Sequence, residues 1–209
     1  METTQNATAT VAMKRRTVDT VLISFGVLAA LVFAVAGALL TWGSNFADDY
    51  VGKELSSQNI TFPSAAALEG QGRGDLVKYA DSKLDTGDEA EAYASYINGH
   101  LQDVADGLTY AELGDVESAA KADVTAAKDA GKSQEEIDGL QATADKITGQ
   151  RNTLFKGETL RGLLLSAYAW ATVGTIAGYA AIGAFVAAGL MALLVILGFV
   201  HLRRAHKTS

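Results

Sequence analysis

Three histidines, at positions 100, 201 and 206, are the side chains of this sequence best suited to metal binding or acid–base catalysis. A non-haem iron site needs two histidines and a carboxylate that converge in one place, and a zinc site has a similar demand for ligands. His201 and His206 follow a long apolar segment, so only His100 lies in the central polar region. Because cysteine is also absent, the sequence predicts no metal, no cofactor and no disulfide.

The acidic stretch DTGDEAE, residues 85–91, is the second candidate for chemistry. It lacks the spaced ligands and the terminal glutamate of a calcium loop. Thr86 and Glu89 instead have the spacing of a helix capping box, and the neighbouring acids favour the first turn of a helix. No nucleophile elbow accompanies His100, and there is no glycine-rich phosphate loop. The sequence therefore predicts no catalytic residue, and we expect the protein not to be an enzyme.

The central region that carries these residues has the pattern of helices. Apolar residues recur at helical spacing from Ala90 to Ala105. Thr109 with Glu112 and Ser133 with Glu136 repeat the capping box before two further predicted helices, and Gly107, Gly131 and Gly149 are predicted to end helices. A shorter helix is predicted within residues 74–84, after a loop around Pro63. No segment alternates like a strand, so an all-α domain is predicted over residues 42–154.

Two long apolar segments flank that domain. No charged residue occurs from Thr20 to Ala47, and none occurs in the 41 residues between Arg161 and Arg203. A membrane crossing needs about 20 apolar residues, and we predict transmembrane helices over residues 18–41 and 177–202. The first run is longer than the apolar core of a signal peptide, about 7–15 residues, so we favour a retained anchor over a cleaved signal. A helix of 41 residues would extend about 60 Å, so residues 155–176 are predicted as a helical lead-in at the membrane surface.

Charge predicts the sidedness of the chain. Residues 44–160 hold 22 acids and 10 bases, whereas both ends are basic. Basic residues beside a span remain in the cytoplasm, which predicts a flexible cytoplasmic tail over residues 1–17, a basic cytoplasmic tail over residues 203–209 and an extracytoplasmic central domain. The topology residues are Lys14, Arg15, Arg16, Arg203 and Arg204. An acidic domain would repel nucleic acid, so we expect no nucleic-acid partner.

The spans carry stripes of small residues, which allow helices in a bilayer to approach closely. The predicted helix-packing residues are Gly26, Ala30, Ala34 and Ala38 in the first span, and Gly174, Gly178, Ala180, Ala184, Ala188 and Ala192 in the second. Pairing of the two spans with each other is favoured over oligomerisation. Trp and Tyr concentrate at membrane interfaces, which assigns Trp42, Tyr168, Trp170 and Tyr179 to that role. Glu158 and Arg161 are predicted to join the domain to the membrane.

The stretches YADSKLDTGDEAEAYASYINGHLQDVADGLTYAEL and TLFKGETLRGLLLSAYAW resemble a family of small actinobacterial two-span membrane proteins whose function is not established. Members are often labelled automatically as aromatic ring-opening dioxygenases. The missing iron ligands argue against that activity here, and the resemblance supplies no catalytic residue. It implies a bacterial cytoplasmic membrane as the location.

These observations predict an all-α membrane protein with two transmembrane helices and an extracytoplasmic helical domain between them. Its partners would be the lipid bilayer and another membrane or envelope protein, or a second copy of itself. We expect a structural or protein-interaction role in the cell envelope. The alternatives are a sensor or accessory subunit of a larger membrane complex and, less favoured, an enzyme.

Overall fold

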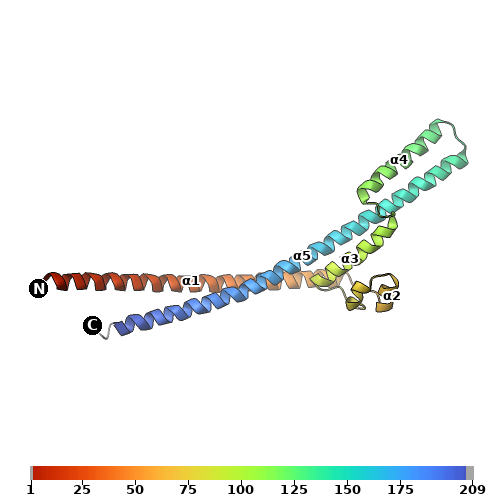
Figure 1. Ribbon diagram of the computed structural model, residues 1–209. Coiled ribbons are helices and arrows are strands. Elements are labelled where there is room, and N and C mark those ends of the chain that lie inside the picture. Colours follow the sequence, from red (N-terminus) through yellow and green to blue (C-terminus); the bar gives the residue numbers. More distant parts are fainter. Residues whose placement is uncertain (1, 206–209) are drawn as a thin grey trace. The chain divides into compact units, whose positions relative to one another are not determined.

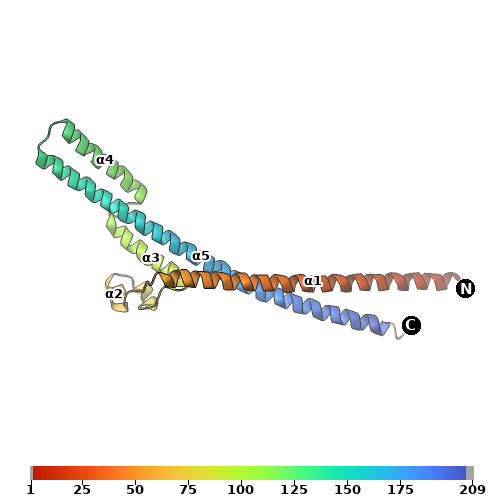
Figure 2. The ribbon, with the colours of Figure 1, turned by 180° about the vertical axis from the view of Figure 1, so that it is seen from behind.

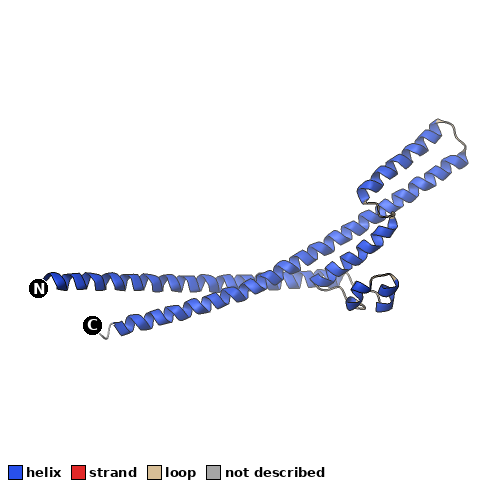
Figure 3. Cartoon of the chain, viewed as in Figure 1, coloured by secondary structure: helices blue, strands red, loops and turns tan. Residues whose placement is uncertain are grey.

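The computed structural model describes the backbone of residues 2–205 and the side chains of residues 17–204. Within this part, helices are the regular elements, and strand pairing is limited to an isolated antiparallel bridge between Thr61 and Lys83 (Figure 3). The elements are α1 (Glu2–Ser57), α2 (Ala65–Gly70), the 3-10 helix η1 (Gly74–Tyr79), α3 (Gly87–Val104), α4 (Tyr110–Asp129) and α5 (Gln134–Ala205), labelled in Figure 1. The prediction of an all-α fold is confirmed.

The chain divides into two compact units. Residues 1–48 and 173–209 form the first, called here the helix pair, and residues 49–172 form the second, called the helical domain. Both long helices, α1 and α5, contribute residues to each unit. By length and composition, α1 from Thr17 and α5 as far as Arg204 are each apolar enough to cross a membrane.

Two predicted features at the ends of elements differ from the structure. The helix α1 begins at Glu2, whereas residues 1–17 were predicted as a flexible tail. No Gly or Pro, the two residues least favourable in a helix, precedes Gly26. Gly149 was predicted to end a helix, and this was wrong because it lies inside the unbroken helix α5. A glycine in a helix costs only about 1 kcal/mol, which the flanking helix formers overcome.

The helical domain is built around an apolar core to which α1, α2, η1, α3 and α5 contribute, whereas α4 contributes Leu113 to a second buried cluster with α3 and α5. Phe62 stacks on Tyr79 with ring centroids 5.4 Å apart and meets Tyr93 edge-on at 5.1 Å. Residues of the predicted lead-in also join this core, so residues 155–172 belong to the helical domain. The buried core residues are Val51, Leu55, Phe62, Leu68, Leu76, Leu84, Ala90, Ala92, Ala94 and Leu164.

Helix α4 lies beside the first part of α5 in both views of the ribbon (Figures 1 and 2). The predicted capping boxes are present at the start of α3 and α4, where Thr86 and Thr109 each accept the backbone N–H of the residue three positions on. Ser133 accepts the Glu136 N–H in the same way before α5. The turn between α4 and α5 uses Gly131 at φ 65°, a left-handed conformation that glycine adopts without a steric penalty.

Candidate functional site

The helix pair is held by close approach of the backbones of α1 and α5. A methyl group placed on Gly174 would lie 2.8 Å from Ala47 Cβ, and one placed on Gly26 would lie 2.7 Å from Val195 Cγ2. Gly37 faces the Phe185 ring in the same manner. These distances leave no room for a side chain, so glycine allows the helices to approach and gain van der Waals contact.

The register of the pair is constant along its length. Ile23 contacts Gly198 at one end of the pair, and Ala47 contacts Gly174 at the other. The number of residues between the two contacts is therefore the same in α1 and in α5. Gly178 lies opposite Ser44 between these points. The two helices are therefore antiparallel, and neither slips against the other over the described residues.

The structure brings some predicted small residues into this contact and leaves others outside. Gly26, Gly174 and Gly178 approach the opposite helix. Half-buried positions are held by Ala30, Ala34, Ala184 and Ala188, whereas Ala38, Ala180 and Ala192 are exposed. Residues spaced four apart drift around the helix relative to the seven-residue repeat that keeps one helical face in contact with another. The ends of each predicted stripe therefore point away from the contact between α1 and α5.

Gly37, Ser44, Ala47 and Ala181 pack in the contact although the sequence stripe omitted them. Steps of seven residues from Ile23 reach Ala30, Gly37 and Ser44, and this was the signal that could have found them. Reading the small residues at an average spacing of 3.5 would have assigned the face correctly.

Outside their mutual contact, α1 and α5 of the helix pair present large apolar side chains to their surroundings. Leu22, Phe25 and Tyr179 are each more than 60% exposed. A surface of this composition over such a length is rare in water. The predicted interface aromatics differ in burial, because Trp42, Trp170 and Tyr179 are exposed whereas Tyr168 is half-buried. Trp42 stacks on Phe46 with ring centroids 5.8 Å apart.

The predicted junction pair joins two turns of one helix. Arg161 Nη1 donates to Glu158 Oε2 at 2.6 Å, and both residues lie in α5. Both side chains are partly exposed, and such pairs contribute little to stability. The contact between elements at this level comes from apolar residues instead. Leu164, Ala167 and Ala171 pack into the core of the helical domain.

A polar cluster between α4 and α5 was missed by the sequence analysis. Glu117 is 6% exposed and is the one buried charged residue in the described part. Its Oε1 accepts from Lys121 Nζ and from Thr148 Oγ1, each at 2.6 Å, and its Oε2 accepts from Arg151 Nη1 at 2.8 Å. The hydrogen bonds from Lys121, Thr148 and Arg151 lower the pKa of Glu117 to about 2.

Arg151 is positioned by more than its carboxylate partner. Its guanidinium carbon lies 4.3 Å from the centroid of the Tyr110 ring, a cation–π contact. A methyl group on Gly114 would lie 3.3 Å from Arg151 Nη2, so this glycine lets the guanidinium lie against α4. The cluster thus fastens α4 to α5 through Tyr110 and Glu117 of α4 and Thr148 and Arg151 of α5, on a surface that has few large apolar side chains.

A second arginine connects η1 to α3. Arg73 donates to both carboxylate oxygens of Asp75, at 3.0 and 2.9 Å. It also donates to the backbone oxygen of Ser95 at 2.8 Å and to its hydroxyl at 2.9 Å. The hydrogen bonds between Arg73 and Asp75 lower the pKa of Asp75 and raise that of Arg73. All three nitrogens of the guanidinium are engaged within this chain, so Arg73 connects the start of η1 to α3.

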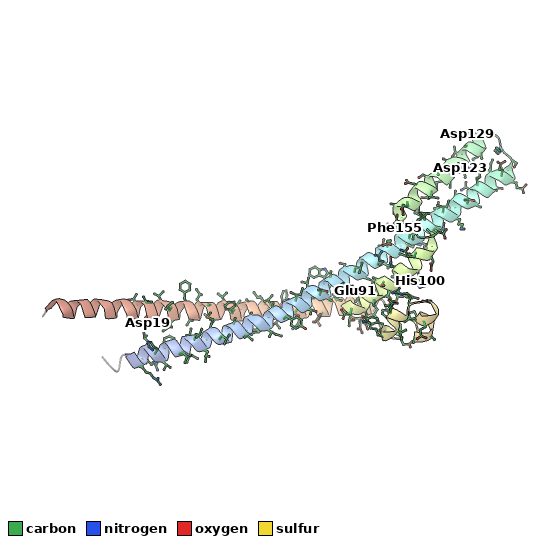
Figure 4. All side chains as sticks on the ribbon, viewed as in Figure 1. Asp19, Glu91, His100, Asp123, Asp129 and Phe155 are labelled. Carbon is green, nitrogen blue, oxygen red and sulfur yellow. The ribbon has the colours of Figure 1, made fainter. Side chains whose placement is uncertain are left out.

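His100 is exposed on α3, and its ring meets the Tyr96 ring edge-on at 4.6 Å (Figure 4). Among the described residues, no group of three His, Cys, Asp or Glu side chains is arranged to hold a metal ion. Arg203 and Arg204 are exposed in the last turn of α5. The side chains of Lys14, Arg15 and Arg16 lie outside the described residues.

Comparison with known proteins gives no relative from which to transfer a function. No family model, no curated protein and no solved structure matches the chain.

Proposed function

We propose that this chain is a non-enzymatic integral membrane protein of the bacterial cell envelope, which acts as a structural or protein-interaction module through its acidic helical domain. The observation that supports this most is the exposed apolar surface of the helix pair. Leu22, Phe25 and Leu194 are each at least 60% exposed there, and burying a side chain of this size in lipid gains about 1.5–3 kcal/mol.

In the proposed topology, both termini are cytoplasmic and residues 49–172 are outside the membrane. The basic residues at the two chain ends support this orientation through the preference of Lys and Arg for the cytoplasmic side. Reporter fusions at Ser209 and beside Gly131 test it. A cytoplasmic reporter is expected to be active at Ser209, and an extracytoplasmic one at Gly131. The reverse pattern, or loss of the chain from the membrane fraction on an alkaline wash, would refute the placement.

The α4–α5 hairpin is the proposed contact surface for a partner protein. Asp123 and Asp129 are exposed along it (Figure 4), and Asp115, Glu135, Glu136 and Asp138 add negative charge to the same pair of helices. Charge on an interface rim steers association and selects partners. A partner with a basic surface is therefore the class that this hairpin would favour.

Affinity capture of the full chain from native membranes tests the interaction. Asp123→Asn with Asp129→Asn is expected to lose the captured partner at 150 mM salt. The matched variant, Asp123→Glu with Asp129→Glu, keeps the charge and is expected to retain it. Equal capture by the neutral and the charge-retaining variants would remove the hairpin from the proposal. Co-migration with a defined membrane complex would favour the accessory-subunit role.

A further inference from the structure

A cavity of about 280 Å³ lies between α1 and α5 at the end of the helix pair that contains Asp19 and His201. The side chains that form its walls are mostly aliphatic, namely Leu22, Ile23, Met191, Leu194 and Val195, and Gly26 and Gly198 also line it. Figure 4 marks Asp19 on α1. The volume is close to the lower limit of about 300 Å³ for small-molecule sites, which suits part of a long molecule.

The lining is polar at one end and apolar along its depth. Asp19 directly precedes the uncharged run that starts at Thr20, and His201 is followed by Arg203 after the second uncharged run. From Asp19 to Gly26 the α1 wall descends about 10 Å at 1.5 Å per residue. If the helix pair spans a bilayer, the polar end therefore lies at the headgroup level and the aliphatic walls lie beside the acyl chains.

Asp19 and His201 are the polar side chains of the lining, and together they select the class of headgroup. The Asp19 carboxylate accepts hydrogen bonds and favours a primary ammonium. An N–H of the His201 imidazole is a donor for a phosphate oxygen. A purely anionic headgroup would accept a hydrogen bond from His201 and leave the Asp19 carboxylate opposed to like charge. A headgroup with both phosphate and ammonium matches both.

We propose that this cavity is a binding site for an aminophospholipid of the phosphatidylethanolamine type. Its ammonium pairs with Asp19, its phosphate receives a hydrogen bond from His201, and one acyl chain fills the cleft between Leu22 and Leu194. The site rests on the membrane placement proposed above. It gives the pair a bound lipid on the side where the two helices leave space between them.

Native mass spectrometry of the full chain in detergent, titrated with phosphatidylethanolamine or phosphatidylglycerol, tests the site. The wild type is expected to bind phosphatidylethanolamine about tenfold more tightly. Asp19→Asn is expected to abolish that preference while leaving phosphatidylglycerol binding unchanged. Asp48→Asn, at the far end of α1's uncharged run, is the matched charge control and is expected to behave as wild type.

A second pair of variants tests the apolar part of the cavity. Leu194→Trp fills the space and is expected to weaken binding of both lipids, whereas Leu193→Trp adds the same bulk at a position outside the lining. Both leucines are more than half exposed, so neither change disturbs the contact of the helices. An engineered disulfide between Ser44→Cys and Gly178→Cys, at the other end of the pair, reports that each variant still folds.

Two results would overturn the lipid site, and both are measured in detergent, so they are read separately from the proposed function. Equal affinity of the wild type for the two lipids would remove the headgroup selection. Equal binding by Leu194→Trp and Leu193→Trp would remove the cavity. If the variants remain in the membrane fraction in either case, only the site fails. If the wild type itself is absent from membranes, the proposed function fails first.

Discussion

Glu117 and Arg151 are 34 residues apart in the sequence, yet Arg151 Nη1 donates to Glu117 Oε2 at 2.8 Å across the contact of α4 with α5. The carboxylate is buried while its partners are partly exposed. Removal of one member of such a pair leaves the other without its partner, which costs more than the pair itself contributes. The polar cluster is therefore the feature of the hairpin most sensitive to substitution.

Glu117→Gln is expected to loosen the α4–α5 hairpin. The amide keeps the shape but loses the charge that attracts Lys121 and Arg151, and its NH₂ group faces other donors. Hydrogen exchange of residues 110–150 should accelerate at least tenfold. Glu136→Gln breaks the exposed pair with Lys132 and is expected to change exchange less than twofold. Equal effects from the two variants would contradict the importance of the buried position.

The lowered pKa of the Glu117 carboxylate predicts that the free energy of unfolding decreases in acid. Its pKa is about 2 when folded against an ordinary value of 4.5, so the unfolded chain binds a proton first as the pH falls. The contribution is complete above about pH 4.5 and is lost progressively towards pH 2. Glu89 and Glu112, whose pKa values are also lowered by their capping bonds, act in the same direction.

Circular dichroism measures this pH dependence when the wild type and Glu117→Gln are each denatured at a series of pH values from 7 to 2.5. The difference between the two proteins is expected to be constant from pH 7 to about 5 and to shrink below pH 4.5. A difference that grew on acidification would contradict the lowered pKa.

Two glycine-to-alanine substitutions in the helical domain should change the free energy of unfolding in opposite directions. A methyl group on Gly87 would overlap the Ala171 Cβ, which is fixed to the backbone, whereas one on Gly139 meets nothing within 4 Å. Gly87→Ala is expected to lower the free energy of unfolding by about 1–3 kcal/mol. Gly139→Ala is expected to raise it by about 0.5–1 kcal/mol, because alanine restricts the unfolded chain and favours helix. Urea titration of both variants gives the comparison.

Disulfide trapping tests the contact within the helix pair. A Cβ built on Gly178 lies 3.8 Å from Ser44 Cβ, a separation typical of disulfides, and the chain contains no native cysteine. Ser44→Cys with Gly178→Cys is expected to form the bond readily on oxidation. Adding Gly174→Ala should slow its formation several-fold, because Ala47 Cβ lies 2.8 Å from the new methyl group. Gly189→Ala, where nothing lies within 4 Å, is the control.

Local signals in the sequence predicted the helices of the domain well. Thr86 with Glu89 and Thr109 with Glu112 predicted where α3 and α4 begin, because a capping box acts within four residues. The uncharged runs predicted two helices long enough for a membrane because hydropathy is additive along the chain. Gly149 was misjudged because a single residue's propensity is outweighed by its neighbours.

Long-range features escaped the sequence analysis for a physical reason. Nothing near Glu117 indicates that Arg151 and Thr148 are its partners, since only the hairpin brings them together. Likewise, the predicted stripe ending at Ala38 and Ala192 assumed one helix in isolation. The face that packs is set by two helices that must stay in contact, which favours a repeat of seven residues.

The unchanging register of α1 against α5, from Ile23 to Ala47, has a consequence for tolerated changes of length. A repeat shorter than the natural helical period implies that the two rods wind about each other with a left-handed twist. A one-residue insertion in either helix would rotate the part of that helix after the insertion by about 100°. The glycines of that part would then no longer face the other helix. Deleting seven residues from α1 and seven from the facing part of α5 would preserve the contact between the two helices. The pair can therefore be shortened only in steps of seven residues, whether by evolution or by design.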